Sequence, residues 1–385
     1  MIPYGRQDIT QADIDAVIGV LKSDFLTQGP AVPAFEGAVA NKVRAKYAVA
    51  VNSATSALHI ACLALGLKKG DWLWTSPVTF VASANCALYC GAQVDFVDID
   101  PGTYNLCPQE LEKKLIVAEK EGRLPKIVIP VHLAGQSCDM QAIYLLAKKY
   151  HFKIIEDASH AIGGKYLEQY IGGCQYSDIT VFSFHPVKII TTGEGGMAVT
   201  NDESLASKMR LFRSHGITKE VSEMTREPDG PWYYEQIDLG FNYRMTDIQA
   251  ALGLSQLSRL DQYVQKRNDL ALLYRERFKD SLLIFQKDQK NTYSAYHLFI
   301  MQTQDSADGS IRNNIYKSCL DGGLGVNLHY IPIYRHPFHS KKQNFNKDAF
   351  LASEKYYRCA ITIPLHPNLS QEDLHSIVKT IKDII

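Results

Sequence analysis

The sequence predicts an α/β protein with a mostly parallel central sheet flanked by helices, followed by a smaller C-terminal α+β domain. Short apolar runs alternate with helical patterns in the first part of the chain, which is typical of a parallel sheet with helices on both faces. After about Met245 the pattern changes to a long helical stretch and shorter strand-like pieces. We therefore expect a large domain over residues 1–250 and a small domain over residues 251–385.

The predicted elements of the large domain follow in a regular order. A helix over Thr10–Ser23 begins with a capping pair, because Asp13 follows Thr10 by three residues. The strand-like runs are Tyr47–Val51, Trp72–Thr75, Gln93–Val97, Lys126–Val131, Lys153–Glu156, Ile179–Phe184 and Met197–Thr200. The helical patterns between them are Ala54–Leu65, Phe80–Cys90, Pro108–Glu121 and Asp139–Tyr150. Because ligands of such sheets bind at the carboxyl ends of the strands, the residues that follow each strand are the candidates for a site.

The small domain is predicted from fewer and shorter elements. It begins with a long helical stretch over Thr246–Lys279 that has room for a bend. Strand-like pieces follow at Ala295–Met301, Gly325–Leu328 and Ala360–Pro364, separated and closed by helical patterns at Ser310–Asp321 and Ser370–Ile385. Before this domain, Met224–Tyr234 contains two prolines and a glycine and predicts a long loop.

Composition and charge narrow the possible classes of protein. Of 385 residues, 46% are hydrophobic, and 41 Lys and Arg balance 41 Asp and Glu. This balance gives no electrostatic support for binding to nucleic acid or to an anionic membrane. The N-terminal region has no basic segment followed by an apolar one, and the most apolar long window, 48–67, is interrupted by polar residues. We therefore expect neither a signal peptide nor a membrane span.

The cysteines point to a reducing compartment. All eight are scattered, without CxxC pairs and without the spacing of a metal site. Cys86 and Cys90 are four residues apart, as two positions on one helix face would be. We expect a cytoplasmic protein whose thiols serve as small core residues, and no metal.

Lys188 is the position around which the rest of the chain is organised. It follows the apolar run Ile179–Phe184, precedes the loop signal Gly193–Gly196, and has the apolar neighbours Val187 and Ile189. A lysine from which water is excluded has a lowered pKa and can condense with an aldehyde. The alternative is a lysine that extends its ammonium group to solvent from a loop between two strands.

Other residues could form a binding site together with this lysine. The small hydroxyl residues of Asn52–Ser56 lie at a strand-to-helix junction, where free backbone N–H groups can bind a phosphate, or where a serine simply caps the helix. Ser183 could offer its hydroxyl to the same phosphate or could bond to backbone like an ordinary strand serine. Phe80 follows a strand end, where it could stack on a flat heteroaromatic ring or pack in the core.

The strand Lys153–Glu156 leads into two carboxylates and a histidine, at Glu156, Asp157 and His160. A carboxylate there needs a cation or hydrogen-bond donors. A protonated pyridine nitrogen would be such a partner, and that proton makes the ring an electron sink. Alone, Asp157 would be read as the cap of the next turn. Together, a phosphate-binding turn, a stacking ring, an acidic strand end and a lysine describe a pyridoxal phosphate site.

At this point the chain resembles the fold-type I aminotransferases of the DegT/DnrJ/StrS sugar-aminotransferase family, over nearly its whole length. The strings that carry the resemblance are Leu26–Gly29, Asn52–Ser56, Glu156–Asp157 with His160, Phe182–His185 with Lys188, Gly193–Gly196, Gly240–Met245 and Gln249–Ala251. Within the family, Phe212–Gly216 and His329–Pro332 are most similar to the C4-aminotransferases of pseudaminic acid biosynthesis.

The resemblance implies a role for each matched residue. Lys188 would bond to the cofactor aldehyde and later move the proton between substrate carbon and cofactor, while Asp157 would hold the pyridinium proton. His160 would lie beside the ring or its phenolic oxygen, and Phe80 would stack on the ring. The phosphate would be bound by Ala54, Thr55, Ser183 and, from the partner subunit of a homodimer with shared active sites, Asn242. The nucleotide-sugar pocket would be lined by Tyr4, Phe25, Leu26, Thr27, His329 and Tyr330; the last two could also form a satisfied polar pair.

The expected reaction, by resemblance, moves an amino group from L-glutamate to C4 of a UDP-4-keto-6-deoxy-N-acetyl-hexosamine. One branch of the family dehydrates its substrate and has histidine at the lysine position, so Lys188 favours transamination. The alternatives are a C4-aminotransferase of another UDP- or dTDP-keto-sugar, of the bacillosamine type, and a catalytically silent regulatory protein that binds the cofactor. A nicotinamide-dependent oxidoreductase is disfavoured, because no G-x-G-x-x-G follows the first strand.

Overall fold

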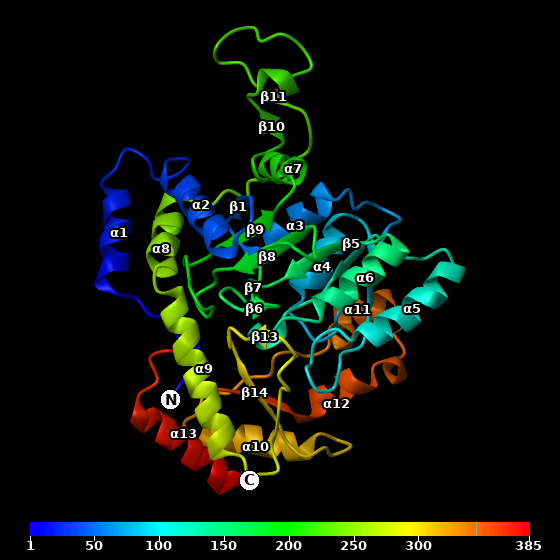
Figure 1. Cartoon of the computed structure of the whole chain (residues 1–385), viewed down its shortest axis with the longest axis vertical. Helices are drawn as coiled ribbons and strands as arrows, with labels where there is room; N and C mark the ends of the chain where they lie inside the picture. The colour runs from blue at the N-terminus through cyan, green and yellow to red at the C-terminus, as the bar shows by residue number, and fades with distance from the viewer. Residues whose placement is uncertain (344) are drawn as a thin grey trace.

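A seven-stranded sheet forms the centre of the computed structural model, which describes residues 1–343 and 345–385 (Figure 1). The strand order is β1-β9-β8-β5-β4-β2-β3, and β9 alone runs antiparallel to its neighbours. The strands are β1 (Tyr47–Val51), β2 (Trp72–Thr75), β3 (Gln93–Phe96), β4 (Ile127–Ile129), β5 (Lys153–Asp157), β8 (Ile179–Ser183) and β9 (Gly196–Thr200). The prediction of a mostly parallel sheet is confirmed.

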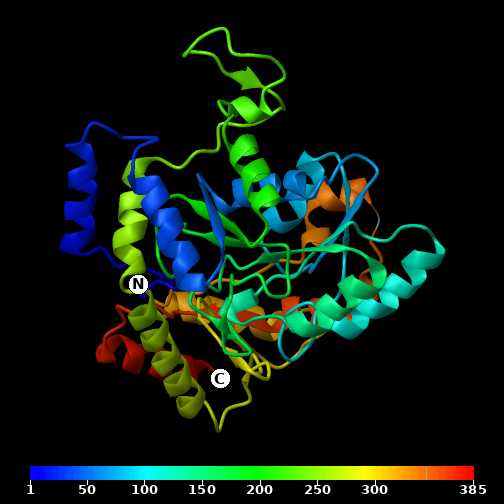
Figure 2. The same cartoon turned by 45° about the horizontal axis from the view of Figure 1, so that its top comes forward.

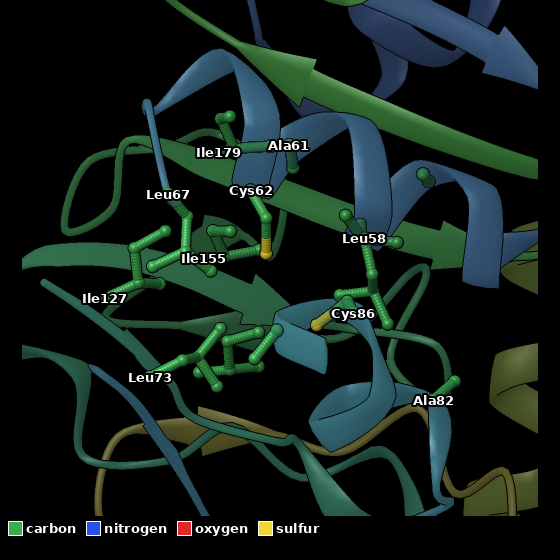
Figure 3. Close-up of a cluster of buried hydrophobic side chains, with 14 of the residues drawn as sticks. Leu58, Ala61, Cys62, Leu67, Leu73, Ala82, Cys86, Ile127, Ile155 and Ile179 are labelled. Atoms are coloured by element: carbon green, nitrogen blue, oxygen red, sulfur yellow. The ribbon is translucent and has the colours of Figure 1, made fainter. Parts of the chain in front are cut away.

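Helices cover both faces of this sheet, as its alternating side chains require. Val49 and Val51 of β1 lie in one core and Ala48 and Ala50 in another, because successive residues of a strand point to opposite faces. The first core packs under α3 (Ala54–Ala64), α4 (Ala82–Tyr89) and α7 (Glu203–Arg213). The opposite face is covered by α2 (Ala31–Val43), α5 (Pro108–Lys120), α6 (Met140–Tyr150), α8 (Asp247–Leu257) and part of α9 (Leu260–Arg277). Figure 3 shows Cys62 of α3 beside Ile155 of β5, and Leu58 of α3 next to Cys86 of α4, in the first core.

The C-terminal part of the chain has its own sheet and core. Its strands are β12 (Ile284–Phe285), β14 (Phe299–Gln302) and β15 (Ala360–Ile363), all antiparallel. Its helices are α10 (Ser310–Asp321), α11 (Pro337–Lys342), α12 (Leu351–Cys359) and α13 (Gln371–Ile384). Three short helical turns, at Leu133–Gly135, Ile333–Arg335 and Lys347–Ala349, connect larger elements. The division into domains at residue 250 stays a prediction, since α9 contributes to cores in both parts.

Two projecting pieces complete the chain. Helix α1 (Gln11–Leu21) packs along α8 and is fastened by Asp13, which binds Arg259 at 2.6 Å. The hairpin of β10 (Ile217–Thr218) and β11 (Glu235–Gln236) extends away from the body, with a helical turn at Val221–Glu223 and the predicted loop at its tip (Figures 1 and 2). A small sheet of β6 (Lys165–Tyr166), β7 (Gln169–Tyr170) and β13 (Thr292–Tyr293) links the two parts of the chain.

One predicted stretch is interrupted and one predicted strand is wrong. The long helical stretch over Thr246–Lys279, for which a bend was allowed, is divided into α8 and α9, because Arg259 leaves helical geometry, at φ −104° and ψ 3°, where its side chain binds Asp13. The strand Gly325–Leu328 does not form. Instead, Gly325 donates to Ile2 and Asn327 pairs only with Thr362 of β15, so the segment is shared between two partners.

Four of the helices named above, α2, α7, α11 and α12, were not among the predicted elements. Other boundaries differ from the predictions by a few residues, as is usual for frayed helix ends and short strands. In the described residues no helix combines the length and the apolar character needed to cross a membrane. All eight cysteines are free thiols.

Candidate active site

A cavity of about 1000 Å³ opens at the carboxyl ends of the central strands. Ten of the residues predicted for the site line it, although they come from segments far apart in the sequence: Tyr4, Ala54, Thr55, Phe80, Asp157, His160, Ser183, Lys188, His329 and Tyr330. Asp157 and Ser183 end strands of the central sheet, and Ala54, Thr55, Phe80, His160 and Lys188 lie in the segments that follow such strands, as expected for a parallel sheet. Residues predicted to bind the cofactor and residues predicted to bind the sugar therefore line the same cavity.

Lys188 extends into the cavity from the loop between β8 and β9. Two hydrogen bonds hold the end of this loop against its start, because both the Thr191 hydroxyl (2.9 Å) and the Thr192 N–H (3.0 Å) donate to the Phe184 carbonyl. Burial lowers the pKa of the Lys188 amine to about 8, although the nearby charge of Asp157 acts in the opposite direction. In the described part of the chain, no carboxylate lies within ion-pair distance of this amine. A buried lysine with a lowered pKa is suited to act as a nucleophile and as a base.

Asp157 is the last residue of β5 and is nearly fully buried, with 5% of its surface exposed. Its carboxylate accepts hydrogen bonds from the Ser83 hydroxyl at 2.7 Å and from the Ser159 N–H at 3.1 Å. The preceding Glu156 points to the other face of the sheet, where it accepts from Ser177 and binds His132 at 2.7 Å. Of the two adjacent carboxylates, only Asp157 therefore belongs to the cavity.

The N-terminus of α3, which the sequence predicts to bind a phosphate, lines the cavity. Ser53 caps the helix by accepting from the Ser56 N–H at 3.1 Å, which leaves the Ala54 and Thr55 N–H groups without a partner inside the helix. Gly196 of β9 makes this close approach possible, because a Cβ there would lie 2.5 Å from the Ala54 nitrogen. Free N–H groups and the helix dipole together favour a phosphate at this point.

Three buried histidines, His160, His297 and His329, surround the base of the cavity. Burial, followed by the charge of Lys188, lowers the pKa of His329 to about 3. Burial likewise holds the pKa of both His160 and His297 well below its usual range, so all three rings are neutral. The positive charge at the base of the cavity therefore resides on Lys188.

The hydrogen bonds of His160 define its tautomer. Its Nδ1 accepts from the Ala134 N–H at 3.3 Å, so the proton resides on Nε2. This Nε2–H lies 3.1 Å from the Tyr330 hydroxyl oxygen and donates to it. Tyr330 thus accepts from His160 and keeps its own O–H for another acceptor.

Four predicted site residues lie outside the cavity lining. Asn242 is exposed and its backbone carbonyl accepts from the Asn52 side chain at 3.4 Å. Phe25 and Leu26 have 53% and 49% of their surface exposed, and Thr27 forms a bridge with Thr246. The roles predicted for these residues involve a partner subunit or a bound sugar and stay predictions.

Several lining residues were not predicted as site residues. They include His297, Asn327, His336, Glu194 and Gln249. His297 lies 4.5 Å from His160 between ring centroids, and its only sequence signal was a histidine embedded in an apolar strand-like run, Ala295–Met301. Gln249 belongs to a string that carried the family resemblance, and it donates to the Glu194 carbonyl at 2.8 Å.

The residues present fit pyridoxal phosphate. Four features meet in one cavity: a buried amine, a carboxylate that accepts from two donors, an exposed phenylalanine ring (57%) and a helix N-terminus that faces a glycine. In the described residues, no three His, Cys, Asp or Glu side chains come together as ligands for a metal ion. The donor set therefore suits an organic phosphate with a flat ring.

Comparisons with known proteins agree with this geometry. A UDP-4-amino-4,6-dideoxy-N-acetyl-beta-L-altrosamine transaminase of Campylobacter jejuni is 36% identical, covering 100% of this chain and 98% of the relative. The structure superposes on Helicobacter pylori PseC, an aminotransferase involved in pseudaminic acid biosynthesis, with a TM-score of 0.91, 32% identity and coverage of 100% and 98%. It also superposes on the PLP form of a sugar aminotransferase from Streptococcus pneumoniae, with a TM-score of 0.89, 29% identity and the same coverage.

The family model described as the DegT/DnrJ/EryC1/StrS aminotransferase family matches residues 7–382. The match spans the central sheet, the cavity and the C-terminal sheet together. The chain belongs to this family of pyridoxal phosphate-dependent sugar aminotransferases.

Proposed function

We propose that this aminotransferase moves an amino group from L-glutamate to C4 of a UDP-linked 4-keto-6-deoxy-N-acetyl-hexosamine, in the cytoplasm, as a step of pseudaminic acid biosynthesis. The observation that carries the proposal is the placing of Lys188, Asp157 and the sugar-side residues Tyr4, His329 and Tyr330 around one cavity. The names of the C. jejuni relative and of the H. pylori enzyme support this choice of sugar.

When bound, pyridoxal phosphate supplies an aldehyde that bonds to amines and a ring that accepts electrons. Asp157 would hold the proton on the ring nitrogen, since its carboxylate is buried and has donors on only part of its edge. The α3 N-terminus and Ser183 would bind the phosphate, and Phe80 would cover one face of the ring. Together these residues would fix the ring so that the amine of Lys188 faces its reactive carbon.

Lys188 has two tasks in such a site. Its amine would bond to the cofactor, and its free form would move a proton between the substrate carbon and the cofactor. A pKa of about 8 leaves a substantial fraction of the amine unprotonated near neutral pH. The three neutral histidines nearby would contribute hydrogen bonds without adding charge.

A homodimer with shared active sites would complete the cavity. Among the described residues that line it, Lys188 is the only Lys or Arg, whereas a UDP-sugar and glutamate are both anionic. The exposed Asn242 follows Leu239, which has 73% of its surface exposed, and precedes Asp247, whose N–H donates to the carbonyl of Leu26, a residue with 49% of its surface exposed. Contact between two copies through this surface would bury those side chains and could bring Asn242 and further cations to the partner's cavity.

A spectrophotometric titration tests the proposal. The purified protein, loaded with pyridoxal phosphate, is titrated with a panel of UDP- and dTDP-4-amino sugars while the visible cofactor band is followed. Loss of this band with one UDP-4-amino-4,6-dideoxy-N-acetyl-hexosamine alone is expected. A response to a bacillosamine-type or dTDP sugar instead would reassign the substrate, and a bound cofactor without any response would favour a catalytically silent protein.

A further inference from the structure

Two buried hydroxyl groups, those of Thr79 and Ser83, lie beside the Asp157 carboxylate and have been assigned no role so far; Thr79 also lines the cavity. Thr79 and Ser83 have 2% and 0% of their surface exposed. Their hydroxyl oxygens are 2.9 Å apart, and the Ser83 hydroxyl is 2.7 Å from Oδ2 of Asp157. Both residues belong to the turn into α4, and Phe80 lies between them on the same turn.

The chemistry of these groups gives the chain of hydrogen bonds a direction. A carboxylate accepts only, so the single proton of the Ser83 hydroxyl is donated to Asp157. Thr79 must then donate to the Ser83 oxygen. Each bond polarises the next, so the Thr79 hydroxyl strengthens the donation from Ser83 to the carboxylate.

Asp157 depends on such donors because it is buried without a cation. In the described residues no Lys, Arg or His lies within ion-pair distance of its oxygens. A buried carboxylate of this kind stays ionised only where hydrogen bonds replace the lost water. Two donors reach it, the Ser83 hydroxyl on Oδ2 and the Ser159 N–H on Oδ1.

We propose that Thr79 and Ser83 are positioning residues that hold the Asp157 carboxylate through hydrogen bonds and turn its remaining edge toward the ring nitrogen of the bound cofactor. The inference rests on the proposed function, since it assigns a task to the same site. The turn from Thr79 to Ser83 then has two roles, because it presents Phe80 to one face of the ring and orients the acid at the ring nitrogen.

The expected change in cofactor affinity depends on the kind of hydrogen bond that each substitution removes. Removing a donor from a buried charged group weakens ligand binding by about 10- to 100-fold, so Ser83→Ala should raise the dissociation constant of pyridoxal phosphate by this factor. Thr79→Val removes a bond between two neutral hydroxyls, one step further away. It should raise the dissociation constant by about 2- to 10-fold.

The experiment compares matched variants of the full-length protein, using pyridoxal phosphate as the probe. Thr79→Ser keeps the hydroxyl that Thr79→Val removes, with little difference in shape. Thr75→Val is the control for a lost buried hydroxyl, because Thr75 donates to the Ile129 carbonyl and does not contact Asp157. The dissociation constant is measured by the absorbance of the bound cofactor, and the rate of amino transfer from L-glutamate is measured in the loaded proteins.

A structural role and a positioning role give different results. A positioning role predicts that Thr79→Ser and Thr75→Val bind the cofactor like wild type and that Thr79→Val and Ser83→Ala do not. It also predicts a fall in the maximal rate of amino transfer, with little change in the glutamate concentration that gives half that rate. In an Asp157→Ala background, the further loss caused by Thr79→Val should disappear, because the group through which Thr79 acts is gone.

Three results would overturn the inference: equal binding by Thr79→Val and Thr79→Ser, an equal loss in Thr75→Val, or the same Thr79→Val effect with and without Asp157. These outcomes differ from a failure of the proposed function. If wild-type protein does not bind pyridoxal phosphate at all, the proposed function fails. If wild type binds and reacts while the Thr79 variants are indistinguishable, only the positioning role fails.

Discussion

The lowered pKa of Lys188 makes a quantitative prediction about cofactor capture. The burial of the amine brings its pKa to about 8, against an ordinary value of 10.5. At pH 7 a group with a pKa of 8 is about 9% unprotonated, and one with a pKa of 10.5 is about 0.03% unprotonated. The buried site therefore offers about 300-fold more free amine than an exposed lysine would.

Rapid mixing of cofactor-free protein with pyridoxal phosphate measures this amine directly. The rate at which the visible band appears should rise with pH from 6 and level off above an inflection near pH 8. Because the Asp157 charge raises the pKa of Lys188, Asp157→Asn should move the inflection to lower pH. Glu194→Gln is the matched control, since Glu194 lines the cavity but is not a cause of the shift, and it should leave the inflection unchanged.

Two results would refute this reasoning. An inflection near the ordinary value of 10.5 would mean that water reaches the amine and that the loop of Lys188 is not closed as the structure has it. A shift to higher pH in Asp157→Asn would mean that Asp157 does not act on Lys188 through its charge. Either outcome is measured on the rate of capture, so a weaker final affinity in the variant does not obscure it.

Three further predictions concern the shared site, the phosphate and the N-terminal helix. Lys188→Ala and Asn242→Ala should each be inactive or nearly so, yet mixing the two should recover activity if each hybrid dimer has one complete site; an assay without recovery on mixing would argue against sharing. Gly196→Ala should weaken pyridoxal phosphate binding by at least about 10-fold, since the added Cβ meets the Ala54 nitrogen at 2.5 Å, and unchanged binding by absorbance would contradict this phosphate site. Asp13→Asn should destabilise the fold by about 2 kcal/mol at pH 7, because hydrogen bonds and the charge of Arg259 outweigh burial and lower the pKa of Asp13 to about 2. The folded pKa is below the unfolded one, so this stability is present above about pH 4 and is lost as the pH falls toward 2; thermal unfolding of the variant should depend less on pH in that range.

Local sequence patterns were sufficient to predict the strands of the central sheet. Apolar runs bounded by turn residues predicted all seven of its strands within a few residues, since strands buried on both faces read as continuous hydrophobic segments. They were less informative where a segment's structure depends on distant partners. Gly325–Leu328 has a strand-like pattern, but its backbone groups are divided between Ile2 and Thr362, so no strand forms.

The same contrast holds for helices. The long helical pattern after Thr246 contains Gly253, but neither Ser258 nor Arg259, which lie between α8 and α9, is a proline or a glycine, so nothing local marks the position of the break. The break occurs at Arg259, whose side chain forms an ion pair with Asp13, almost 250 residues earlier in the chain. Such a contact has no signature in the sequence around Arg259.

For the site, the sequence by itself determined which residues are candidates for the chemistry: a lysine after one strand, an aspartate ending another, hydroxyl groups at a helix start and an aromatic ring. These side chains follow strand ends, and the direction of a parallel sheet gathers strand ends at one edge. The tertiary structure decided what surrounds them. It selected Asp157 over Glu156 by the alternation of β5, brought His297 beside His160, and placed the hydroxyls of Thr79 and Ser83 beside the carboxylate. The physical reason is that burial and hydrogen-bond partners are properties of packing between distant segments, and these properties set the charge state on which each residue's role depends.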